Sequence, residues 1–125
     1  MRVLIMGRIN AAWSEETHEV KRGQFWPAFV DLHRRWRDLG AKLLGTIDDS
    51  MLMVGAPTTR QFNFYELYEV DGVDTVAKML DIVRKSDRED VNMYRFIRLE
   101  AIIGPAVSAE AEAFWNQDDA TDSAG

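Results

Sequence analysis

The stretch FNFYELYEV, residues 62–70, predicts the clearest β-strand of the chain. Aromatic and β-branched side chains favour strands, and here apolar and polar positions mostly alternate. A second apolar run, RVLIMGRI at residues 2–9, has few polar positions, which is typical of a strand covered on both faces. The two stretches together predict a sheet with little surface left to water.

Helical and extended patterns alternate on either side of these strands. Apolar residues recur every three or four positions over residues 25–39 and again over residues 73–83, which predicts two core-facing helices. Residues 41–47 and 92–103 predict two more strands, and a short extended segment at 51–54 predicts an added hairpin.

The start of the first helix allows two interpretations. One kinked helix runs from about Glu15 to Leu39, or Gly23 ends a short first piece and Pro27 opens a second one at its first helical position. In both cases Gly40 is a natural residue to end it, because glycine adopts the left-handed conformation common after a helix.

The order β-α-β-β-α-β predicts an α+β fold, a ferredoxin-like sandwich with a four-stranded antiparallel sheet and both helices on one face. We expect one domain over residues 1–107, then a short helix and a disordered acidic tail over 108–125. The strands carry apolar residues at both odd and even positions, so both faces of the sheet need to be covered. We therefore expect a homodimer in which a second copy covers the second sheet face.

Composition narrows the function classes. The 125 residues include 15 basic and 21 acidic side chains, a net charge of −6, which argues against nucleic acid as a partner. The absence of cysteine excludes disulfides and thiolate metal sites and fits the cytoplasm, and no apolar run is long enough to span a membrane. Two histidines specify no metal site, and no phosphate loop or dinucleotide fingerprint is present, so we expect no cofactor.

The element pattern over residues 1–104 resembles the dimeric α+β barrel superfamily, which includes small cofactor-free monooxygenases, isomerase-like and dehydratase-like enzymes. Three stretches, FWPAF (25–29), LLGTIDDSMLMVGAP (43–57) and LEAIIGPAV (99–107), also resemble the IacB family of small proteins encoded with bacterial indole-3-acetate catabolism enzymes. The resemblance implies a catabolic role on an indolic or aromatic acid, or on an oxidised product of one.

The first helix carries the candidate base and the candidate stacking residues. His33 lies on the flank shared with Trp26 and could act as a general base near neutral pH, or it is a hydrogen-bonded boundary histidine. Trp26 and Trp13 stand where an aromatic ligand could stack. Asp48 and Asp49 follow a strand and suit a turn, although Asp49 could orient a base or a substrate amine at the mouth of the barrel.

Polar residues that interrupt apolar strands are the remaining candidates. Arg98 either pairs with Glu66 across the sheet or holds a substrate carboxylate through two parallel hydrogen bonds. Tyr65, Tyr94 and Asn10 are the other candidate polar contacts, although the two strand parities cannot all face one pocket.

The sequence therefore predicts a small cytoplasmic, cofactor-independent oxygenase, isomerase or dehydratase of aromatic catabolism. The alternative is a non-catalytic homodimeric module that binds an aromatic or fatty acid, and a third possibility is a dimeric interaction protein without a ligand.

Overall fold

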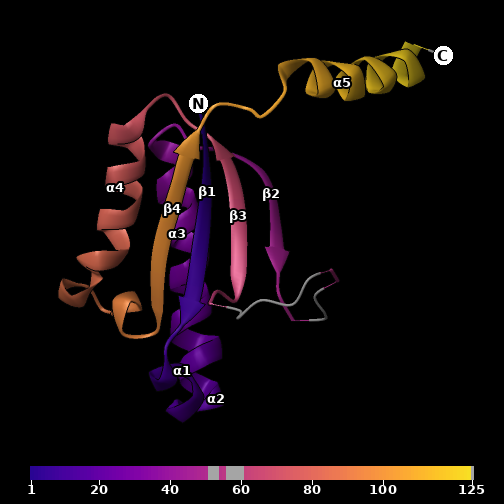
Figure 1. Cartoon of the computed structure of the whole chain (residues 1–125). Coiled ribbons are helices and arrows are strands. Elements are labelled where there is room, and N and C mark those ends of the chain that lie inside the picture. The colour runs from indigo at the N-terminus through magenta and orange to yellow at the C-terminus, as the bar shows by residue number, and fades with distance from the viewer. Residues whose placement is uncertain (51–53, 56–60, 125) are drawn as a thin grey trace.

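A four-stranded antiparallel sheet forms the centre of the computed structural model, which describes residues 1–50, 54–55 and 61–124, with only the backbone for 118–124 (Figure 1). The strands are β1 (Arg2–Ile9), β2 (Lys42–Asp48), β3 (Phe64–Glu69) and β4 (Ile97–Gly104), in the order β2-β3-β1-β4. Every pairing is antiparallel. The predicted α+β class and the four-stranded antiparallel sheet are confirmed, and this order is compatible with a ferredoxin-like fold.

The first helical region is a series of short pieces that leads into one long helix. The pieces are α1 (Ala11–Glu15), α2 (His18–Val20), the π-helical turn η1 (Lys21–Phe25) and α3 (Trp26–Asp38). The structure combines parts of both interpretations: the backbone breaks in extended conformation at Glu16, and from His18 it runs without a break through the π-turn into α3. Pro27 lies in the first turn of α3, as the second interpretation predicted, but the predicted helix end at Gly23 is wrong.

Both ends of α3 carry the predicted signals. A proline occupies its first turn, and Gly40 follows it with φ +99°. Residues Phe25, Leu32 and Trp36 of the predicted stripe are buried, with Leu32 and Trp36 1% exposed. The indole Nε1 of Trp36 donates to the carbonyl of Met79 over 2.9 Å, which ties α3 to the second long helix, α4 (Val73–Arg84).

The core lies between one face of the sheet and the helices α3 and α4. Alternate residues of β1, including Val3 and Ile5, have no exposed surface. On α4 the buried residues are Val76, Met79 and Val83, whereas Val73, which begins the predicted stripe, is 57% exposed. None of the described helices covers the opposite sheet face, as Figure 1 shows.

Two other predicted elements differ from the structure. The predicted last strand begins at Ile97 rather than residue 92, because the 3₁₀ turns η2 (Ser86–Arg88) and η3 (Met93–Arg95) precede it. The extended segment predicted at 51–54 lies, apart from Val54, outside the described residues.

The C-terminal helix is longer than predicted. The helix α5 (Ala109–Ala124) continues through the segment expected to be a disordered tail, and the Ser108 hydroxyl caps it by accepting from the backbone N–H of Ala111 over 3.1 Å. Figure 1 shows α5 extending away from the sheet. Among the described helices, none is both long and apolar enough to cross a bilayer.

Gly7 on β1 should be intolerant of a side chain. The ring of its β3 neighbour Phe64 lies over Gly7, and a Cβ there would overlap the ring. We expect Gly7→Ala to lower the free energy of unfolding by about 1–3 kcal/mol, measured by urea denaturation, because the ring must leave a packed position. Gly45→Ala on β2 is the control, since a Cβ there meets open space. Equal stability of the two variants would contradict this packing.

Candidate functional site

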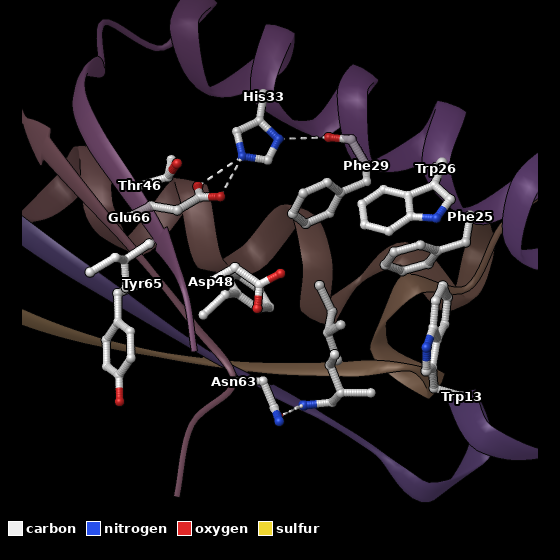
Figure 2. Close-up of a pocket in the computed structure, with 14 residues that line it drawn as sticks. Trp13, Phe25, Trp26, Phe29, His33, Thr46, Asp48, Asn63, Tyr65 and Glu66 are labelled. Carbon is white, nitrogen blue, oxygen red and sulfur yellow. Dashed lines mark hydrogen bonds and ion pairs between the residues drawn. The ribbon is translucent and has the colours of Figure 1, made fainter. Parts of the chain in front are cut away.

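A cavity of about 420 Å³ lies between α3 and the β2–β3 side of the sheet. Its volume is in the range of small-molecule sites. Side chains from α3 form one wall, and β2 and β3 form the other (Figure 2). The lining residues are Ile9, Trp13, Phe25, Trp26, Phe29, His33, Thr46, Ile47, Asp48, Asn63, Phe64, Tyr65, Glu66 and Ile97.

The half-buried His33 and the buried Glu66 and Tyr68 form a polar array at one end of this cavity. The Nε2 atom of His33 lies 2.8 Å from both carboxylate oxygens of Glu66. The Tyr68 hydroxyl donates to Glu66 Oε1 over 2.7 Å. Glu66 and Tyr68 are 5% and 3% exposed, so the array is largely closed to water. The alternation of β3 causes this arrangement, because residues two apart point to the same sheet face.

The second nitrogen of His33 is also engaged. His33 Nδ1 lies 2.7 Å from the carbonyl oxygen of Phe29, one turn earlier on α3. A carbonyl and an ionised carboxylate are both acceptors, so each ring nitrogen must carry a proton to make these contacts. The geometry therefore suits an imidazolium paired with the Glu66 carboxylate. In that state His33 has no free lone pair, and Glu66 is the group that can accept a proton.

Electrostatics favour the same state. Burial lowers the pKa of His33, but the hydrogen bond to Glu66, the Phe29 carbonyl and the negative charge of Glu66 outweigh it. The net effect raises the pKa of His33 above 6.5. Burial is the largest of the effects that raise the pKa of Tyr68. The hydrogen bond from the Tyr68 hydroxyl to Glu66 raises this pKa further. Tyr68 therefore stays a neutral donor to the carboxylate.

The other end of the cavity is aromatic. The ring of Phe29 lies 4.6 Å from that of His33 and 5.5 Å from that of Trp26, centroid to centroid. Trp13 and Phe25 extend the wall, with ring centroids 4.7 Å apart. The π-turn ends at Phe25, directly before α3. Such a wall suits a planar aromatic ligand.

Four of the predicted site residues line this cavity: Trp13, Trp26, His33 and Tyr65. His33 reaches toward Glu66 in Figure 2, and Trp26, which is 48% exposed, lies along the aromatic wall. Tyr65 also lines the cavity. Strand alternation nevertheless puts the side chain of Tyr65 on the opposite sheet face from that of Glu66, and in Figure 2 the Tyr65 ring extends away from His33.

The predicted carboxylate Asp49 is replaced in the lining by its neighbour Asp48. The pairing of β2 with β3 shifts by one residue between Leu43 and Gly45. This irregularity reverses which residues face α3, so that Thr46 and Asp48 face the cavity. The backbone N–H of Asp49 donates to the Asn63 carbonyl over 2.8 Å.

The remaining predicted contacts lie outside this cavity. The Asn10 amide donates to the carbonyls of Tyr94 and Arg95, over 3.4 and 3.1 Å, and joins the end of β1 to η3. Arg98 lies on the sheet face away from α3, opposite Arg8, with its guanidinium 3.5 Å from the centre of the Tyr94 ring.

The predicted pairing of Arg98 with Glu66 is therefore wrong, because the two side chains occupy opposite sheet faces. Glu66 was considered only as a partner for Arg98, and its role beside His33 was missed. One signal in the sequence could have found it. Glu66 and Tyr68 share the parity that alternation buries, and a buried carboxylate needs a charged or donating partner.

The array at Glu66 is not a metal cluster. Within the part of the chain that the structure describes, no three His, Asp or Glu side chains are placed to hold a metal ion. The described lining carries two carboxylates and one imidazole but no lysine or arginine, so its polar part favours a ligand that donates hydrogen bonds.

Neither protein-family models nor curated proteins give a match to this chain. What the cavity can bind or catalyse therefore follows from its own residues.

The raised pKa of His33 makes stability depend on pH. The ion pair contributes fully below the unfolded value of 6.5 and is lost as pH rises through the higher folded pKa. We expect the free energy of unfolding to fall over that interval in wild type and to fall less in Glu66→Gln. An NMR titration of the imidazole should give a lower His33 pKa in Glu66→Gln. An unchanged pKa would contradict the ion pair. The exposed His18 gives a second imidazole signal in the same spectra.

Proposed function

We propose that the protein is a small cytoplasmic, cofactor-independent enzyme that removes a proton from an aromatic substrate, with Glu66 as the proton acceptor. One observation carries this proposal: the Glu66 carboxylate is held between His33 and Tyr68 at the closed end of an aromatic cavity. General bases with this degree of fixation and desolvation are typical of acid–base catalysis.

The charges of the array support deprotonation. Before the reaction, His33 and Glu66 form a pair with no net charge. When Glu66 takes a proton from an O–H, N–H or C–H group, the imidazolium remains and stabilises the substrate anion beside it. Glu66 Oε1 accepts from both Tyr68 and His33, whereas Oε2 accepts from His33, so Oε2 is the better placed to receive the proton.

The substrate class follows from the two ends of the cavity. We place the ring of an aromatic acid, an indole-3-acetate derivative among the candidates, against Trp26 and Phe29, with its acidic hydrogen toward Glu66. A carboxylate on that substrate lies toward solvent, away from Asp48 of β2 and Glu66 of β3, because both carboxylates of the lining repel it. The anion then isomerises, loses a leaving group or reacts with oxygen, the reaction classes of the isomerases, dehydratases and monooxygenases that the sequence resembles.

We also propose a homodimer of the dimeric α+β barrel type. The strand order is compatible with it, and the sheet face without helices carries apolar side chains that include Ile47 and Ile102, 63% and 59% exposed. Burial of such a face is what a second copy supplies.

Binding can be tested by calorimetry with indole-3-acetate, phenylacetate and octanoate. We expect the aromatic acids to bind, and Trp26→Ala to weaken them about two- to tenfold through loss of ring contacts. Val30→Ala is the control, because Val30 is exposed on the same helix α3 and lies outside the cavity. Failure of every probe to bind would argue against both the enzyme and the binding module.

Catalysis can be tested by hydrogen exchange of bound probes in D₂O, followed by NMR with indole-3-acetate and its ring-hydroxylated derivatives. We expect Glu66→Gln to slow the exchange by about 10²–10⁴-fold while affinity is retained. Glu100→Gln, on the other sheet face, should leave the rate unchanged. Exchange that survives in Glu66→Gln would refute Glu66 as the base. Tight binding without exchange in wild type would favour the binding module.

A further inference from the structure

The helix α5 has little of its own domain beneath it. It extends from the end of β4 away from the sheet (Figure 1), and an ion pair joins Glu112 of α5 to Arg2 of β1. Phe114 and Trp115 are 59% and 69% exposed, with ring centroids 6.3 Å apart. Isolated helices of this length are marginal in water. A 16-residue helix with two exposed aromatic rings is therefore expected to pack against another surface.

The sheet face without helices offers such a surface. The register places Leu67, Leu4 and Ile102 in one row across β3, β1 and β4, and alternation puts all three on this face. Ile47 and Tyr65 pair in the next row. These side chains form an apolar band across the middle of the sheet, which we call the outer band.

Basic residues bound the outer band at both ends. Arg2 and Lys42 lie at one end, on either side of Glu69 and with Arg2 paired to Glu112 of its own chain. Arg8 and Arg98 face each other across β1 and β4 at the other end, which makes that end the more positive one. Like charges directly opposite on a sheet are unfavourable unless an anion lies near them. The face as a whole carries these four basic side chains and two acidic ones, Glu69 and Glu100.

The sequence of α5 has the complementary charge. Residues 109–124 contain no basic residue and five acidic ones. They are Glu110, Glu112, Asp118, Asp119 and Asp122. The helix thus combines exposed aromatic rings with a net negative charge, and the outer band combines apolar side chains with a net positive rim.

We propose that α5 of one copy lies across the outer band of a second copy, and that the second copy returns the same contact. This inference rests on the proposed homodimer, with the outer band covered by the partner's α5 in place of the partner's sheet, and it does not depend on the chemistry at Glu66. A helix of 16 residues is about 24 Å long, close to the roughly 26 Å of an eight-residue strand. The four residues 105–108 direct α5 away from its own sheet, whereas a two-fold axis brings it to the sheet of the partner.

Disulfide trapping tests the contact directly, because the chain has no cysteine. Ala111 lies three and four residues before Phe114 and Trp115 and so shares their helix face. Chains with Ala111→Cys, isotopically labelled, are mixed with unlabelled Ile102→Cys chains and oxidised. We expect disulfides between labelled and unlabelled chains, detected by mass. Lys78→Cys, at an exposed position of α4, replaces Ile102→Cys in the control and should give none.

Sedimentation separates this inference from the homodimer on which it rests. We expect a wild-type dimer, and a Phe114→Ser/Trp115→Ser variant whose dimer Kd is raised by about tenfold or more. The control Val30→Ser removes a residue that is 60% exposed on α3 and should leave the dimer unchanged. A monomeric wild type overturns both proposals. If the dimer Kd is unchanged by the α5 substitutions and no mixed disulfide forms, the α5 contact alone is overturned. The same holds if a disulfide forms only within one chain that carries both Ala111→Cys and Ile102→Cys.

Discussion

The ion pair between His33 and Glu66 is the interaction on which the cavity depends. It joins the middle of α3 to the middle of β3, across 33 residues of sequence. Removing one member of a buried pair typically costs about 3–5 kcal/mol, because the other is left charged without a partner. The pair therefore holds α3 to β3 at the polar end of the cavity, beside the core contacts of Leu32 and Trp36.

Strand alternation then divides the molecule into two chemically different faces. Glu66 and Tyr68 point toward the helices, whereas Tyr65 and Leu67 point away, so neighbouring residues of one strand serve the cavity and the outer band. The same division separates Arg98 from the cavity. Arg98, which interrupts an apolar strand, thus lies on the sheet face away from α3 and not in the candidate active site.

Local pattern was sufficient for the elements but not for their contacts. The stripe of α3 and the strands followed from periodicity, and His33 and Trp26 followed from their positions on that helix. Glu66 was missed as the partner of His33 because the register that brings them together is a tertiary property. Asp48 rather than Asp49 lines the cavity because the irregularity between Leu43 and Gly45 changes which β2 residues face α3, and the predicted strand included no such shift. The length of α5 was underestimated because its polar composition is shared by helices and disordered chains.

The position of β2 has a consequence for how a ligand enters. β2 is an edge strand that pairs only with β3 in this sheet, and all seven of its residues are exposed, yet Thr46 and Asp48 form part of the cavity wall. Edge strands with little buried surface open locally at a smaller free-energy cost than the core. Local opening of β2 therefore widens the entrance to the cavity at Thr46 and Asp48. A ligand that contacts this strand slows the hydrogen exchange of its backbone amides. The exchange rate of β2 therefore reports ligand binding, in addition to any change at the lining side chains.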